Sequence, residues 1–175
     1  MLMRLLGSRI RRDRAPGVRR GSGVVIGRRV SLHVGPGAEL VLANGCRIGA
    51  RTCIVVHNGR VEIGPGAVLG ERCTLVSHSG VTIGAGAQLG HGAVIVDFDH
   101  AFDDVERPIR LQPLASAPVT IGAGARVGFG ASLLRGVSVG AHASIDPHAV
   151  VTRDVPAGAR VGGVPARPAP GRRGD

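Results

Sequence analysis

The chain of 175 residues contains no Trp, no Tyr and no Lys, and it has only 3 Phe. Because aromatic residues make up 2% of the chain and hydrophobic residues 43%, its core must be built from Val, Ile, Leu and Ala, which suits regular stacked layers. All 22 basic residues are Arg, a bias typical of genomic base composition, so the pI of about 11.6 is weak evidence for an acidic partner. The sequence has neither an aromatic platform nor a recognisable motif for binding nucleic acid, so we expect no nucleic-acid partner.

Long apolar segments are also missing. No stretch approaches the ~20 apolar residues of a membrane span. The N-terminal sequence MLMRLLGSRIRRDR has too short an apolar run, and no small-residue cleavage site, for a secretory signal. Three Cys (Cys46, Cys53 and Cys73) form no CxxC motif, which predicts free thiols in a reducing compartment. We therefore expect one cytoplasmic domain, with the inner membrane surface as an alternative location.

Gly is abundant, with 29 residues, and it recurs in a repeat of six. The units IGPGAV, LGERCT and LVSHSG, residues 63–80, are typical: the first position is Ile, Leu or Val, the second is usually Gly, and the fifth is usually small. The segments VEIGPGAVLGERCTLVSHSG and VTIGAGAQLGHGAVIVDFDH superpose with a period of 20, which is three hexads plus two residues. A fixed period of this length indicates a repeat architecture.

Each hexad can form a short strand and a turn, with its first and fifth residues pointing inward. Gly supplies backbone freedom at a tight corner, and its frequency excludes stable helices. Three hexads then close one triangular coil, and stacked coils pair through parallel strands. The sequence predicts an all-β parallel solenoid of roughly seven coils over residues 23–165, in which Cys46 and Cys73 take small inward positions.

The repeat is interrupted by DFDHAFDDVERPIRLQP, residues 97–113, which holds two of the Phe and five of the 12 acidic residues. We expect the chain to leave the solenoid over residues 97–118, as a loop of ~20 residues, a length usually reserved for function or disorder.

The motifs of the second half resemble a known family. VTIGAGARVGFGASLLRGVSVGAHASIDPHAVVTRDVPAGARVGGVPARP, residues 119–168, is similar to the terminal coils of the hexapeptide-repeat acyltransferases, closest to sugar O-acetyltransferases. The interruption is similar too, because such enzymes often carry D-x-D-H followed by PI-x-x-Q, and those places are held by Asp97, Asp99, His100, Pro108, Ile109 and Gln112. The resemblance implies a left-handed parallel β-helix, although parallel crossovers are generally right-handed. It also implies acetyl-CoA as donor, no metal, and a homotrimer with donor sites between subunits.

Two positions depart from the family pattern. Arg126 stands where Trp is usual and Val164 where Asn is usual, and IDPHAV replaces the commoner IGAGS. These changes fall where the family binds the donor. The resemblance assigns donor binding to Arg126, Gly128, Arg153, Arg160 and Arg167, and Arg side chains suit the phosphates of CoA. The alternative for these arginines is a solvated basic tail, and we assign Arg172 and Arg173 to that tail.

Acyl transfer from a thioester to a hydroxyl needs a base that removes the proton of the alcohol. A His has a pKa near neutrality and gains from a carboxylate that fixes its tautomer. We predict His100 as this base, with Asp97 and Asp99 as catalytic carboxylates; the alternative is an ordinary surface His in a polar loop. A Gly-rich corner would supply N–H groups to the oxyanion, although the sequence does not identify which.

His57 and His78 take the same place in successive units, so we expect them to stack beside the start of the loop. His78 and Gln112 are the predicted acceptor-binding residues. A zinc site completed by Asp or His100 is an alternative for this pair, as in the γ-class carbonic anhydrases, but we expect none. His33 and His91 are interpreted as exposed, and His142 and His148 as lying on adjacent faces. The acids Asp103, Asp104 and Glu106 either contact the acceptor or keep the loop soluble.

The two termini differ in composition from the repeat. Residues 1–22 combine Arg with an apolar helical pattern, made by Leu2, Met3, Leu5, Leu6 and Ile10, that would either cap the first coil or contact a membrane surface. Residues 166–175 form a Pro- and Arg-rich tail that we expect to be disordered.

Two functions remain from different classes. The first is an acyl-CoA-dependent O-acetyltransferase acting on a sugar or glycan precursor by direct transfer. The second is a non-catalytic β-solenoid scaffold, with zinc hydration as a distant third; a serine acetyltransferase is disfavoured because no sizeable N-terminal helical domain is present.

Overall fold

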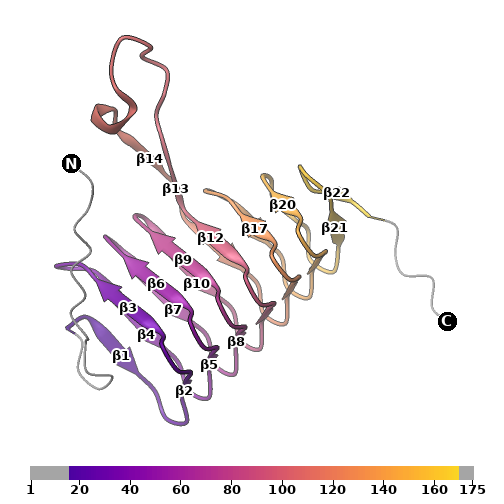
Figure 1. Ribbon diagram of the computed structural model, residues 1–175. Coiled ribbons are helices and arrows are strands. Elements are labelled where there is room, and N and C mark those ends of the chain that lie inside the picture. Colours follow the sequence, from indigo (N-terminus) through magenta and orange to yellow (C-terminus); the bar gives the residue numbers. More distant parts are fainter. Residues whose placement is uncertain (1–15, 170–175) are drawn as a thin grey trace.

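The computed structural model describes residues 16–169, and almost every element in it is a short strand (Figure 1). Three parallel sheets form the sides of a triangular prism. Sheet A contains β1 (Val18–Arg20), β4 (Glu39–Leu42), β7 (Arg60–Ile63), β10 (Gly80–Ile83), β15 (Val119–Ile121) and β18 (Ser138–Val139). Sheet B contains β2 (Val25–Ile26), β5 (Arg47–Ile48), β8 (Val68–Leu69), β11 (Gln88–Leu89), β16 (Arg126–Val127), β19 (Ser144–Ile145), β21 (Arg160–Gly162) and β22 (Arg167–Pro168). Sheet C contains β3 (Ser31–Val34), β6 (Cys53–Val56), β9 (Thr74–Ser77), β12 (Val94–Val96), β17 (Ser132–Leu133) and β20 (Val150–Val151).

Each coil of the chain contributes one strand to each sheet, in the order A, B, C. We name the corners of the prism by the sheets that they join: AB, BC and CA. Sheets A and C have 6 strands each, whereas sheet B continues to β21, so the described chain has six full coils and the start of a seventh. This is the left-handed parallel β-helix that the resemblance implied, with six full coils where roughly seven were predicted.

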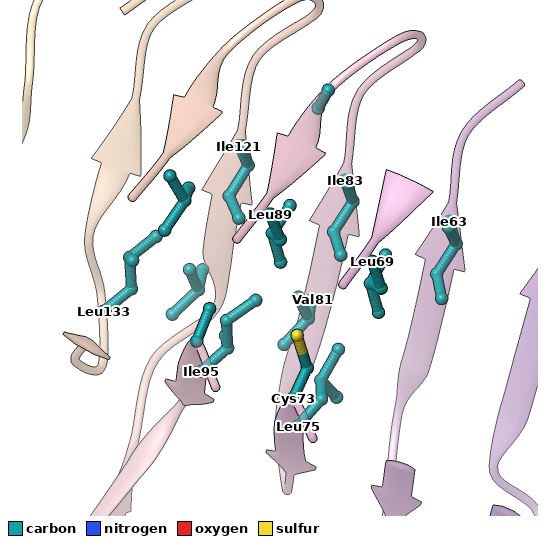
Figure 2. Packing of buried hydrophobic residues seen from close by; sticks show 14 of the residues in the cluster. Ile63, Leu69, Cys73, Leu75, Val81, Ile83, Leu89, Ile95, Ile121 and Leu133 are labelled. Carbon is teal, nitrogen blue, oxygen red and sulfur yellow. The ribbon is translucent and has the colours of Figure 1, made fainter. Parts of the chain in front are cut away.

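The core is a set of aliphatic ladders inside the prism (Figure 2). In sheet A the inward residues of neighbouring coils pair directly, as in Leu40 with Val61 and Val61 with Val81. Cys46 and Cys73 are buried at the small inward positions, as predicted. Ala, Val and Cys fit there because a coil is too narrow for two large side chains side by side.

The Gly residues of the hexad occur at two positions, and each position requires Gly for a different physical reason. The Gly after the first aliphatic residue lies against the next coil: a Cβ on Gly70 would lie 2.6 Å from the backbone N of His91, which no side chain tolerates. The later Gly of the hexad, for example Gly66, has a φ of +65°, a conformation that residues with a Cβ disfavour. The Gly after the aliphatic residue is therefore required by the close stacking of the coils, and the later Gly is required by the geometry of the turn.

The interruption leaves the prism as predicted, and the structure places this exit at the CA corner, from which the loop projects well beyond the coils (Figure 1). Its base is an antiparallel hairpin of β13 (Phe98–His100) and β14 (Leu114–Ser116), in which Phe98 pairs with Ser116 and His100 with Leu114. A single turn of 3-10 helix, η1 (Ile109–Leu111), lies in the distal part.

The ends of the solenoid differ from the predicted boundaries. β1 pairs with β4, so the first coil begins before residue 23. At the other end, β22 pairs with β21 and Ala166 donates its N–H to the carbonyl of Val150 at 2.8 Å, so residues 166–169 are ordered parts of the fold rather than a disordered tail. The remaining terminal predictions, for residues 1–15 and 170–175, lie outside the described residues. Within residues 16–169 no helix is long and apolar enough to span a membrane.

Candidate active site

Asp97 joins the projecting hairpin to the coil below it. Its carboxylate is fully buried and accepts four hydrogen bonds: from Ser77 Oγ at 2.7 Å and from the backbone N–H groups of His78 (2.7 Å), Ser79 (2.9 Å) and Gly80 (2.6 Å). Its backbone carbonyl also accepts the N–H of Ala117 at 2.9 Å, where the chain returns. A buried carboxylate is tolerated only when it is fully hydrogen-bonded, and here it fixes both ends of the hairpin.

This geometry gives Asp97 a different set of partners from the one predicted. The sequence suggested that Asp97 orients the imidazole of His100, whereas its carboxylate contacts the turn of residues 77–80. Asp99 is exposed, and its Oδ1 accepts the backbone N–H of His100 at 2.8 Å. The structure thus shows the two carboxylates holding the chain around His100.

A column of rings runs along the CA corner towards the hairpin. His57 and His78 are stacked, as predicted, with ring centroids 4.3 Å apart and planes inclined by 22°. Phe98 lies edge-to-face against His78 at 4.5 Å, and the ring of His100 follows at 6.4 Å from Phe98. Because one ring is added per coil, the period of 20 extends this column up to the strand that carries His100.

The column has an electrostatic consequence for His57. Partial burial lowers the pKa of His57, and the neighbouring imidazoles of His78 and His33 lower it further. Two imidazolium ions in stacked contact would repel each other. The stacked pair therefore favours a neutral His57.

The imidazole of His100 is exposed at the end of this column. In the part of the chain that the structure describes, its side chain has no hydrogen bond or ion pair. It is thus available to an acceptor, or to a side chain from a second copy of the chain.

Gln112 stabilises the distal part of the hairpin from within. It is 8% exposed, and its Nε2 donates to the carbonyls of Asp104 and Arg107, both at 2.8 Å. Its Oε1 accepts the N–H of Asp104 at 3.3 Å. The amide thus shapes the loop, and the predicted contact with an acceptor stays a prediction, as it does for His78. Asp103, Asp104 and Glu106 are exposed.

An open groove of about 710 Å³ covers the outer side of sheet B. Arg126 and Gly128, both predicted to bind the donor, lie in it together. The outward side chains of Arg47, Gln88 and Arg126 form part of the lining, and Phe129, 47% exposed, stands at the BC corner. A flat ligand with a charged end would meet both apolar and cationic side chains here.

The other predicted donor residues are divided between two places. Arg160 lies on the same outer column of sheet B as Arg126, with Ser144 between them. Its guanidinium pairs with both carboxylate oxygens of Asp146, at 2.8 Å and 3.1 Å, which holds it against the end of the prism. Arg167 donates to the carbonyl of Ala166, and Arg153 is exposed at the CA corner, two coils beyond His100.

The predicted base and the sheet B groove lie on opposite sides of one chain. His100 projects from the CA corner, and sheet B is the side of a triangular prism that faces away from that corner, as Figure 1 shows for the hairpin and for β2, β5 and β8. A single copy therefore presents His100 and Arg126 on opposite sides of the prism.

Metal ligation was the alternative for the His column. Among residues 16–169 there is no group of three or more His, Cys, Asp or Glu side chains arranged to hold a metal ion. Stacking also turns the faces of His57 and His78, rather than their nitrogens, towards each other.

Sequence reasoning missed several residues of the site. Ser77, which donates a hydrogen bond to Asp97, occupies the position that Val34 and Val56 hold in the two preceding coils. A polar residue in place of Val was therefore a signal that the sequence alone contained. The ring of Phe98 and the groove residues Arg47 and Gln88 gave no such signal, because the repeat shows which residues face outward but not what they bind.

No family model matches the chain. A curated relative from Mycobacterium tuberculosis, named "Probable acetyltransferase Rv3034c", is 31% identical over 145 residues, which cover 82% of this chain and 48% of the relative. The chain thus spans about half the length of the curated relative that it matches.

Solved structures share the fold at lower identity. A variant of AntD, an N-acyltransferase from Bacillus cereus in complex with dTDP-4-amino-4,6-dideoxyglucose and coenzyme A, has a TM-score of 0.75 at 16% identity, covering 89% of this chain and 83% of its own. The polySia specific acetyltransferase NeuO has a TM-score of 0.63 at 20% identity, covering 93% and 86%. The solved structures thus share the β-helical fold of this chain, and the relative shows that the chain is similar to a protein named as an acetyltransferase over about half of that protein's length.

Proposed function

We propose that the protein is an acyl-CoA-dependent O-acyltransferase that moves an acetyl group onto a hydroxyl of a sugar or glycan precursor. The observation that carries this proposal is the exposed, unpartnered imidazole of His100, held on a hairpin that a buried carboxylate anchors at the break in the repeat. The named relative is an acetyltransferase, and AntD is described with coenzyme A and a nucleotide sugar, which supports this class of donor and acceptor.

In the proposed reaction a nitrogen of His100 accepts the proton of the acceptor hydroxyl as the oxygen attacks the thioester carbonyl. The tetrahedral intermediate collapses by breaking the C–S bond, and the imidazolium returns the proton to the departing thiolate. The products are an O-acetyl ester and the free thiol of CoA. Transfer is direct, in keeping with the lack of a Ser or Cys nucleophile motif in the sequence.

We propose that the active site is built between two copies, in a homotrimer. His100 comes from one copy and the sheet B groove, with Arg126 and Gly128, from its neighbour, because the two lie on opposite sides of one chain. Asp97 and Asp99 position His100 through the backbone. Arg153 and Arg167 would meet the phosphates of CoA, whereas Arg160 would act from its pair with Asp146.

Thiol release from acetyl-CoA, with a panel of nucleotide sugars and oligosaccharides, tests the activity. Matched acceptors that differ only in a hydroxyl or an amino group decide between O- and N-acetylation. His100→Ala should lower the rate by ~10²–10⁴-fold. The control His33→Ala, whose ring lies 6.4 Å from that of His57 on the side away from His100, should not. If no acceptor supports turnover and CoA does not bind, the scaffold alternative holds instead.

A mixing experiment tests the shared site. His100→Ala and Arg126→Ala are each expected to be weakly active alone. When the two variants are unfolded and refolded together, hetero-oligomers contain sites with an intact His100 from one copy and an intact groove from another. Activity above that of either variant supports the shared site, and activity no higher than theirs contradicts it.

A further inference from the structure

The BC corner carries an arginine column that the proposed acyl transfer does not use. Arg29, Arg51 and Arg72 occupy the same turn position in the first three coils. Backbone hydrogen bonds between coils set this register. The N–H of Arg51 donates at 2.9 Å to the carbonyl of Arg28, the residue just before Arg29 in the coil below. In the next two coils the same position is Gly92 and Gly130.

The backbone at these positions is unfavourable for Arg. The φ angles are +57° at Arg29, +61° at Arg51 and +56° at Arg72, in the left-handed region that a Cβ disfavours. Among residues 16–169, the 18 positions with positive φ comprise 13 Gly and five other residues, and three of those five are this column. Three successive coils thus keep a long cationic side chain at a position where the next two coils have Gly and the sixth has His148.

The charges are unfavourable as well. All three side chains are exposed, and within the described chain neither they nor Arg28 take part in an ion pair or side-chain hydrogen bond. Adjacent coils are stacked ~4.8 Å apart, and like charges on directly opposed neighbours destabilise a sheet. On sheet A, by contrast, Arg60 forms ion pairs with both Glu39 and Glu62.

The column borders a hollow of about 510 Å³, lined by Arg28, Arg29, Ala50, Arg51 and Glu71. Three arginines, Arg28, Arg29 and Arg51, therefore line one concave surface together with a single carboxylate, that of Glu71. A guanidinium presents a planar fork of N–H donors that matches phosphate oxygens, and such charge-assisted bonds are strong.

We propose that the arginine column of Arg29, Arg51 and Arg72, together with the adjacent Arg28, is a phosphate-binding site for a ligand whose phosphate groups span neighbouring coils. Bound phosphates remove the repulsion between the stacked arginines, which explains why strain and like charge are kept together at this corner. The site lies on the first three coils, whereas the donor residues Arg126, Gly128, Arg153, Arg160 and Arg167 lie on the last three; the sheet B groove extends between them, and Glu71 lines both hollows. It also stands whether or not the protein transfers acyl groups.

Two probes test the site on the full-length protein. Calorimetric titration with sodium tripolyphosphate measures binding of free phosphate groups, and co-sedimentation with phosphatidylglycerol–phosphatidylcholine vesicles, against pure phosphatidylcholine, measures binding of lipid headgroups. The variant Arg29→Gln, Arg51→Gln, Arg72→Gln is compared with Arg107→Gln, Arg110→Gln, Arg135→Gln, which loses the same charge elsewhere. The column variant should raise Kd at least about tenfold, and the control less than about twofold.

The outcomes are decisive in each case. Loss of tripolyphosphate binding identifies a soluble phosphorylated ligand, and loss of vesicle binding alone identifies anionic headgroups; both support the site. Failure of the wild type to bind either probe, or an equal loss in both variants, overturns it. A third variant, Arg29→Gly, Arg51→Gly, Arg72→Gly, should lose binding yet melt at a higher temperature than the wild type, since Gly relieves both the strain and the repulsion. If it melts lower, the arginines are structural and the proposal fails.

Discussion

Replacing Asp97 by Asn keeps the size of a buried side chain and removes its charge. The carboxylate accepts three donors on Oδ2 and one on Oδ1. An Asn can direct its oxygen to the three donors, but its NH₂ group then faces the N–H of His78, which is left without an acceptor. An orphaned buried donor costs about 1–3 kcal/mol, and the three remaining hydrogen bonds lose their charge assistance, about 1 kcal/mol each.

Neutralisation also removes the desolvation penalty of a buried carboxylate, which offsets part of this loss. We expect a net destabilisation of about 3 kcal/mol, equivalent to a Tm lower by about 6–12 °C for a chain of this size. Calorimetry or circular dichroism measures the shift. The matched control is Asp99→Asn, whose exposed carboxylate binds a single backbone N–H and whose effect should stay within about 0.5 kcal/mol. An Asp97→Asn protein that melts within about 2 °C of the wild type would refute the idea that the Asp97 carboxylate fixes the hairpin to the coil.

Four further outcomes follow from the structure. The pKa of His57 is lowered in the fold, so below the ordinary value of 6.5 the unfolded chain binds more protons than the folded chain. The contribution of His57 to stability should therefore be full above pH 6.5 and decline as the pH falls. In Tm values measured from pH 8 to pH 5, His57→Gln should flatten this decline. Burial raises the pKa of the Cys46 and Cys73 thiols, so a thiol reagent should modify Cys53 alone in the native protein and all three after unfolding; rapid modification of Cys73 in the native state would contradict its burial. Gly70→Ala should destabilise the prism by about 1–3 kcal/mol, because its Cβ would collide with the next coil, whereas Ala in place of the exposed Gln88 should have little effect. Arg126→Ala should raise KM for acetyl-CoA more than it lowers kcat if the sheet B groove holds the donor, and an unchanged KM would remove Arg126 from the donor site.

The features that the sequence predicted well are those that depend on its period. A residue in a solenoid packs against the residues about 20 positions before and after it, so the contacts of Cys73, and the stacking of His57 on His78, follow from the repeat alone. The exit of the chain at Asp97 follows from the same regularity, because a break in the period is a break in the coil.

The partners of polar side chains depended on directions that the repeat does not specify. Asp97 stands three residues before His100 in the sequence, yet its carboxylate points into the turn below, where four donors converge. Gln112 turns back into its own loop, and Arg160 finds Asp146. Hydrogen-bond geometry is set by the orientation of each turn, which sequence spacing does not define.

By itself, then, the sequence determined the coil, the core and the location of the interruption, because periodic burial of aliphatic side chains leaves one regular way to stack. Only the tertiary structure decided that His100 and the sheet B groove face away from each other, and that three unpaired arginines converge at one corner. Both depend on which side of the prism a residue occupies, and it is the closing of three sheets in space that assigns residues to sides.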